Sequence, residues 1–132
     1  MTSSTRNGTN GPSIAHTDPQ DDFTSCLTDL PWGLLLCVKG PARVTALGPL
    51  DCLLARALAR RPQFVVLDGS ELTLLSSLAM GLLVRFHRDL ARWGGRVKLA
   101  GIRPAVRESL ESVRLANLFE FHATVADALA SA

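Results

Sequence analysis

The chain has 132 residues, of which 47% are hydrophobic and 20% are charged, and its net charge is +2. This is enough apolar sequence for one compact domain with its own core and too little for two. The small net charge, the lack of a Lys/Arg block and an aromatic content of 5% exclude a typical nucleic-acid binder.

The first 22 residues differ in composition from the rest of the chain. They are rich in Ser, Thr, Asn, Gly, Pro and Asp and almost lack apolar side chains. Such a segment cannot bury enough surface to offset its ordering entropy, so we predict a disordered tail over 1–22 and one folded domain over 23–132. The tail lacks the apolar core of a signal peptide, and no apolar run could span a bilayer. We therefore expect a cytoplasmic protein without a membrane partner.

Strand-like and helix-like segments alternate along the folded part. In chain order we predict strands over 23–28, 34–38, 64–67, 96–100 and 119–121, and helices over 46–60, 77–93, 105–113 and 125–129. A hairpin turn is predicted over 30–33, and Asp68 with Gly69 predicts a tight turn held by local hydrogen bonds. Strands separated by helices favour an α/β layer structure with mostly parallel pairing. We expect strand 34–38 to be a central strand, and strand 64–67, which is apolar on both faces, to lie away from the exposed edges of the sheet.

The three cysteines, Cys26, Cys37 and Cys52, show no close pairing and no metal-ligand spacing. Cys37 and Cys52 lie in apolar runs, which predicts buried, reduced thiols and suits a reducing compartment. We predict no metal site.

Two serines, Ser76 and Ser77, open the clearest helix. A helix start has unpaired backbone N–H groups and a partial positive charge, so a hydroxyl there is well placed to carry a phosphate. The alternative is that Ser77 only caps the helix, and Ser76 could provide the cap in its place.

The apolar pattern of this helix predicts which face is buried. We expect a buried stripe of Ala79, Leu82, Leu83, Phe86 and Leu90. The residues that share the face of Ser77 are Met80, Gly81, Val84 and Arg88. We predict that Met80 and Val84 are exposed beside the hydroxyl and that a partner covers them, with Gly81 allowing close approach. The alternative is that another element of the chain covers Met80 and Val84.

A series of short motifs runs through the folded part in a fixed order. They are Gly40 after an early strand, Asp68 at a strand end, Gly81 in the serine-led helix, Gly94-Gly95, Arg103-Pro104, Leu115 with Leu118-Phe119, and Asp127-Ala128-Leu129. In the order and spacing of these motifs, the chain from Phe23 to Leu129 resembles a STAS domain, the sulfate-transporter and anti-sigma-factor-antagonist fold. The resemblance implies a mixed β-sheet with helices packed mainly on one side.

In antagonists of this family the helix start usually reads Asp-Ser-Ser-Gly or Asp-Ser-Thr-Gly, and a kinase that is also an anti-sigma factor phosphorylates the first serine. Ser77 falls on that position, while Ser76 replaces the aspartate and Leu78-Ala79 replace the next two residues. Pro41-Ala42-Arg43 stand where the family often has Glu-Leu-Asp. The resemblance implies a monomeric anti-sigma factor antagonist whose unmodified form sequesters the anti-sigma factor kinase, with Ser77 as the phosphorylation site and Ser76, Met80, Gly81, Val84 and Arg88 as the partner-binding residues.

A second interpretation is a STAS scaffold or subunit of a stress-signalling or lipid-transport assembly in which Ser77 is never modified; the altered residue at position 76 favours it. The sequence carries no G-x-S-x-G elbow, metal-binding histidine pair or phosphate-cradling glycine loop. We therefore predict that the protein is not an enzyme and has no catalytic residue. We also predict no cofactor, because the ATP used in phosphorylation would bind to the kinase.

Overall fold

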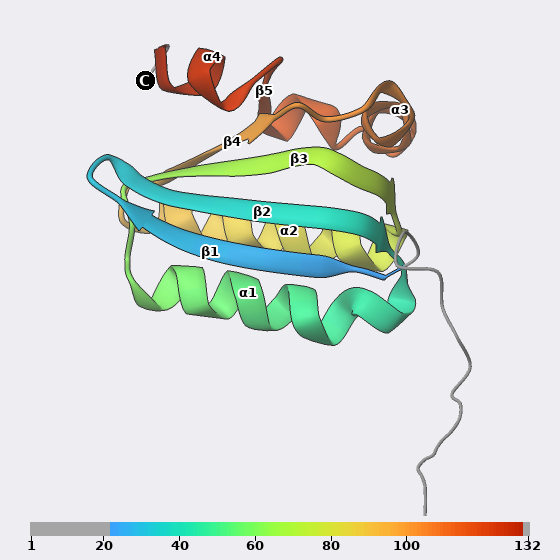
Figure 1. Ribbon diagram of the computed structural model, residues 1–132, viewed down its shortest axis with the longest axis horizontal. Coiled ribbons are helices and arrows are strands. Elements are labelled where there is room, and N and C mark those ends of the chain that lie inside the picture. Colours follow the sequence, from blue (N-terminus) through green and yellow to red (C-terminus); the bar gives the residue numbers. More distant parts are fainter. Residues whose placement is uncertain (1–21, 131–132) are drawn as a thin grey trace, which may run out of the picture.

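The sheet begins with a hairpin, because Pro31 and Trp32 form a two-residue turn between β1 (Thr24–Leu30) and β2 (Gly33–Ala42). The structure is a computed structural model that describes residues 22–130. Three further strands, β3 (Phe64–Leu75), β4 (Arg96–Ala100) and β5 (Glu120–His122), extend the sheet in the order β1-β2-β3-β4-β5 (Figure 1). The β1–β2 pair is antiparallel and every other pair is parallel. As predicted, the strand that begins at Phe64 is not at an edge of the sheet, and β2, which contains residues 34–38, is an inner strand.

Helices connect the parallel strands, as parallel pairing requires. They are α1 (Leu47–Ala59), α2 (Ser77–Ala91), α3 (Pro104–Ser112) and α4 (Val125–Ala130), with short 3₁₀ turns η2 (Val44–Ala46) and η3 (Ala116–Leu118). Pro49 lies in the first turn of α1 and Pro104 begins α3, positions where a missing N–H costs no hydrogen bond.

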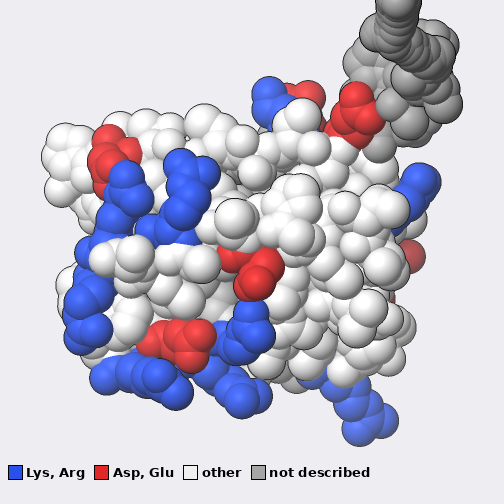
Figure 2. All heavy atoms as spheres, turned by 90° about the horizontal axis from the view of Figure 1, so that it is seen from below, with Lys and Arg blue, Asp and Glu red and all other residues white. Residues whose placement is uncertain are grey.

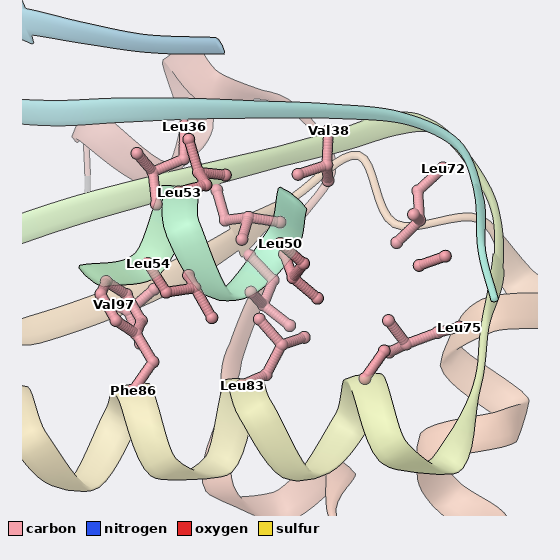
Figure 3. Packing of buried hydrophobic residues seen from close by; sticks show 14 of the residues in the cluster. Leu36, Val38, Leu50, Leu53, Leu54, Leu72, Leu75, Leu83, Phe86 and Val97 are labelled. Atoms are coloured by element: carbon pink, nitrogen blue, oxygen red, sulfur yellow. The ribbon is translucent and has the colours of Figure 1, made fainter. Parts of the chain in front are cut away.

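The main core lies between one face of the sheet and helices α1, α2 and α3. Alternate residues of β2 and β3 point into it and meet the apolar sides of α1 and α2 (Figure 3). Val106 and Leu110 of α3 belong to the same cluster, whereas Ala128 of α4 packs with Phe64, Val66 and Ala100 on the opposite face. The predicted mixed sheet with helices mainly on one side is thus confirmed.

The face under α4 also buries a lysine. Lys98 is 1% exposed, and its ammonium donates a hydrogen bond to the carbonyl of Ala128 at 3.3 Å. Its Nζ lies 3.1 Å from the carboxylate of Glu120 and 5.4 Å from the ring centroid of Phe64. The hydrogen bond to the Ala128 carbonyl ties α4 to the sheet.

The predicted turn at Asp68 and Gly69 is wrong, because β3 continues through both residues to Leu75. The Asp68 carboxylate does accept the predicted local hydrogen bond, from the N–H of Ser70 at 3.0 Å. Instead of turning, the strand absorbs its extra residues in register shifts against β2, between Cys37 and Lys39 and between Gly40 and Pro41. Gly69 is buried, and a Cβ there would come within 2.6 Å of Cδ1 of Ile102.

The predicted burial of the cysteines is also wrong. Cys52 is exposed on α1, because Leu50, Leu53, Leu54 and Ala57 fill the buried side of that helix. Cys37 is only half-buried, and it lies opposite the exposed Cys26 across the β1–β2 pair.

The predicted tail falls on residues 1–21, which lie outside the described residues, and Asp22 is exposed. Within residues 22–130, no helix combines the length and apolar character that crossing a membrane requires.

Five arginines from three segments gather where α1 and α2 end and β4 begins, although the sequence contains no basic run. We call this region the arginine end; it consists of Arg56, Arg60, Arg61, Arg92 and Arg96. Arg61 lies 4.5 Å from the Trp93 ring centroid, and the Trp93 indole N–H donates to the carbonyl of Pro62 at 2.8 Å. Figure 2 shows basic side chains crowded at one side of the face that α1 and α2 cover, while much of the other side is uncharged.

Candidate functional site

The start of α2 separates the two serines into different structural roles. Ser76 has extended backbone angles, and its Oγ accepts a hydrogen bond from the N–H of Ala79 at 3.2 Å. The Ser76 N–H donates to the carbonyl of Ala42 at 2.9 Å, which joins the end of β3 to the end of β2. Ser76 is therefore the cap of the helix, the alternative that the sequence left open.

Ser77 is the first residue of α2, and its side chain is exposed. Within residues 22–130, we find no hydrogen bond that its hydroxyl makes. The N-terminal turn beside it contains no acidic residue. A phosphate on this hydroxyl would meet the positive end of the helix dipole without a neighbouring carboxylate from that turn.

Exposed apolar side chains come from three segments that meet near the start of α2. Val44 is 62% exposed, Leu74 38% and Leu78 58%, and they come from η2, the last residues of β3 and the first turn of α2. The pairing of Ala42 with Leu75 brings the first two segments together. With Ser77 and Gly81 these residues form what we call the helix-start surface: Val44, Leu74, Ser77, Leu78 and Gly81.

A shallow hollow between α1 and α2 continues this surface. Leu47 and Leu82 line it together with Leu78. Arg85 and Asp51 close its far side, where a guanidinium nitrogen lies 2.8 Å from a carboxylate oxygen. A Cβ added at Gly81 would meet nothing within 4 Å, so this glycine leaves the flank of the helix open.

The expected exposure of Met80 is wrong. Met80 is 5% exposed and belongs to the core, whereas Leu82, expected in the buried stripe, is only half-buried. Val84 is half-buried and packs against the core, so the alternative that the chain itself covers these two residues is correct for Met80 and largely so for Val84. Gly81 and Arg88 are exposed as expected.

The reason for this difference is the position of α2 on the sheet. The helix turns Met80 toward the core and presents Leu78 and Leu82 toward α1. His87, on the other flank, makes an edge contact with Phe119, with 5.6 Å between the ring centroids. The sequence analysis did not identify three residues of the helix-start surface: Val44, Leu74 and Leu78. Leu78 could have been recognised, because an apolar side chain in the first turn of a helix lies beyond the reach of the elements that cover the rest of the helix.

Ionisable groups on the α4 side form a separate cluster. The ring of His122 hydrogen-bonds the Glu120 carboxylate at 2.8 Å, and this contact, helped by Lys98, lowers the pKa of Glu120. No group of three metal-ligating side chains occurs in the part of the chain that the structure describes.

This arrangement, a mixed sheet with helices packed mainly on one side, defines a class of α/β domain that solved structures share. One is an anti-sigma factor antagonist from Mycobacterium paratuberculosis, with a TM-score of 0.77 and 22% identity over 88% of this chain and 97% of that one. Another is the Bacillus cell fate determinant SpoIIAA in the phosphorylated form, with a TM-score of 0.63 and 17% identity over 83% of this chain and 98% of that one.

A third is a sulfate transporter family protein from Wolinella succinogenes, with a TM-score of 0.64 and 16% identity over 74% of this chain and 81% of that one. These likenesses establish the fold. The family model of the STAS domain matches residues 34–128, so the chain belongs to the STAS domain family, and the resemblance stated from the sequence is confirmed. No curated protein matches the chain.

Proposed function

We propose that this protein is an anti-sigma factor antagonist whose helix-start surface docks on an anti-sigma factor kinase in the cytoplasm. The observation that carries this proposal is an exposed Ser77 at the start of α2, near which three segments contribute exposed apolar side chains. A monomeric protein gains nothing in solubility from Val44, Leu74 and Leu78 in water, whereas a partner that covers them gains hydrophobic stabilisation. Protein binding, rather than catalysis, is the activity that such a surface supports.

Phosphorylation of Ser77 would act as the switch. A phosphate adds about two negative charges at pH 7 and three acceptor oxygens to the centre of the helix-start surface. A partner that packs apolar atoms against Leu78 would have to desolvate this charge, which weakens the complex. Two structural neighbours support this part of the proposal, because one is an anti-sigma factor antagonist and another is solved in a phosphorylated form.

The experiment is to incubate the full chain with ATP and each candidate anti-sigma factor kinase of the same genome. Mass spectrometry should find one phosphate, on Ser77, and none in Ser77→Ala. The unmodified protein and Ser77→Ala should bind the kinase, while Ser77→Glu should bind it on the order of tenfold more weakly, about 1.4 kcal/mol. Modification of Ser76 or Ser70 with Ser77 bare would overturn the assignment of the site.

A docking variant tests the surface independently of the phosphate. Leu78→Asp should abolish binding to the kinase while the protein stays folded, because the side chain is exposed. Arg88→Ala is the matched control, because Arg88 is exposed on the same helix further from its start and belongs to the partner-binding residues predicted from the sequence. If Arg88→Ala abolishes binding and Leu78→Asp does not, the partner uses the middle of α2 instead.

The second candidate function is a scaffold or subunit that is never phosphorylated. It is supported by Ser76 at the position where the resemblance expects aspartate, and by the structural neighbour from a sulfate transporter family. The absence of phosphate with every kinase, together with a partner that binds Ser77→Glu and the unmodified protein equally, would favour it.

A further inference from the structure

Cys26 and Cys37 lie directly opposite each other on the antiparallel β1–β2 pair. Opposed residues of an antiparallel pair project from the same face, with Cα atoms about 4.5 to 5.5 Å apart. This spacing falls inside the range of about 4.4 to 6.8 Å that a disulfide bond requires. The backbone spacing of these two positions therefore suits a disulfide bond without rearrangement of the strands.

The face that carries the two thiols is open to solvent at this point. It is the face opposite α1, α2 and α3, since the neighbouring residues Leu36 and Val38 of β2 point into the main core. On this face α4 packs over Phe64, Val66 and Ala100 of β3 and β4. Trp32 and Leu35, at the turn end of the hairpin, pack against the same cluster, whereas Cys26 and Cys37 do not belong to it. Cys26 is exposed and Cys37 is half-buried, so a small oxidant reaches Cys26 first.

The surroundings give the two sulfurs different chemical roles. Cys26 Sγ lies 3.9 Å from the Thr28 hydroxyl oxygen, near the limit of a sulfur hydrogen bond, at the surface of the strand. Burial, and next the negative charge of Asp68 on the adjacent strand, raise the pKa of Cys37. Cys37 is thus kept as the protected thiol, and Cys26 is the one offered to solvent.

We propose that Cys26 and Cys37 form a reversible disulfide when the protein meets a hydroperoxide, independently of the proposed docking function. In the first step the Cys26 thiolate attacks one peroxide oxygen, the O–O bond breaks, and Cys26 becomes a sulfenic acid while the peroxide leaves as water or an alcohol. In the second step the Cys37 thiolate attacks Cys26 Sγ, the S–O bond breaks, and hydroxide takes up the proton that Cys37 lost and leaves as water. Two thiols are oxidised by two electrons and the peroxide is reduced by two.

The bond would restrain the edge of the sheet. β1 has a strand on one side only, and the new link would tie it covalently to β2 and close a ring from Cys26 to Cys37. The start of β1 lines a hollow together with Arg43 and Thr45, which flank Val44 of the helix-start surface. An exposed bond of this kind is open to attack by thiols, so it would be reversed by a glutathione-type reductant.

The test uses the full chain, oxidised with hydrogen peroxide and digested without reduction by a protease that cuts before aspartate. Asp22, Asp29, Asp51 and Asp68 place each cysteine on its own fragment: residues 22–28, 29–50 and 51–67. We expect fragments 22–28 and 29–50 to remain joined and 51–67 to stay free. Titratable thiols should fall from three to one, and glutathione should restore all three.

Two variants and one physical measurement complete the test. In Cys37→Ser, Cys26 should go on to a sulfinic acid because no second thiol intercepts the sulfenic acid; in Cys52→Ser, the joined fragments should form as in the parent. The oxidised parent should melt several degrees above the reduced one, because the link constrains the unfolded chain. Three thiols after oxidation, a link to 51–67, or an oxidised form that melts no higher than the reduced one would each overturn the proposal.

Discussion

Truncation of Ser76 should destabilise the domain, whereas truncation of the adjacent Ser77 should not. In Ser76→Ala the N–H of Ala79 loses its partner, and Ala79 is 0% exposed, so water cannot replace the hydroxyl. A buried donor left unpaired costs about 1 to 3 kcal/mol, and loss of an N-cap side chain typically costs about 1 kcal/mol. We therefore expect Ser76→Ala to lower the free energy of unfolding by about 1.5 kcal/mol, or roughly 5 °C in Tm.

Ser77→Ala should leave the free energy of unfolding within about 0.5 kcal/mol of the parent, because the side chain is exposed. Urea unfolding at equilibrium, with the m-value held constant across the variants, measures the difference. Ser76→Asp is the matched control, since aspartate caps a helix about as well as serine and should preserve stability. If Ser77→Ala proves the more destabilising of the two, Ser77 is the cap and its place in the docking switch is wrong.

Three further predictions concern packing and charge. Val84→Asp should destabilise the domain by about 2 kcal/mol or more, because Val84 packs against the core, while Leu78→Asp should change stability by about 0.5 kcal/mol or less; equal losses in urea unfolding would contradict the exposure of Leu78. Gly69→Ala should lower the free energy of unfolding by about 1 to 3 kcal/mol, because the new Cβ would meet Cδ1 of Ile102. Ile102→Val removes that atom and should restore part of the lost stability. If the two substitutions are additive in the double variant, this contact is not the cause. The pKa of Glu120 is lower in the folded than in the unfolded state, so this carboxylate stabilises the domain above the ordinary glutamate pKa of 4.5, and the stabilisation is lost as the pH falls through the folded pKa. In Glu120→Gln the free energy of unfolding should therefore depend less on pH in that acid range. An unchanged pH dependence would argue against the contact with His122.

Local patterns were sufficient to predict the order of strands and helices. The apolar run at Phe64–Leu67, the leucine spacing of α1 and the Gly94-Gly95 stop after α2 each act within a few residues, and each element formed where its pattern lies. The full length of β3 was not predictable in this way. Asp68 and Gly69 have turn propensity, but pairing with β2 on both sides of Gly69, and of Asp68 with β4, keeps the strand extended.

The local hydrophobic pattern also could not predict how α2 is rotated about its axis on the sheet. Met80 and Leu82 are both apolar, and hydropathy alone cannot decide which of them faces the core. The choice depends on where α1 and Phe119 pack against the helix flanks, which is tertiary information. The pairing of Cys26 with Cys37, in contrast, was available from the predicted turn, because the two residues lie equally far from its ends at Leu30 and Gly33.

The arginine end and the helix-start surface lie at opposite ends of α1 and α2, and salt acts on them differently. Exposed charges are screened over about 8 Å at physiological ionic strength, whereas apolar contact is not weakened by moderate salt. An acidic partner that first meets Arg61 and Arg92 would associate more slowly as salt is added, and an uncharged apolar surface that meets Leu78 and Val44 would associate at a nearly constant rate. The ionic-strength dependence of an association rate therefore indicates whether a binding partner approaches the arginine end or the helix-start surface, even before a structure of the complex is known.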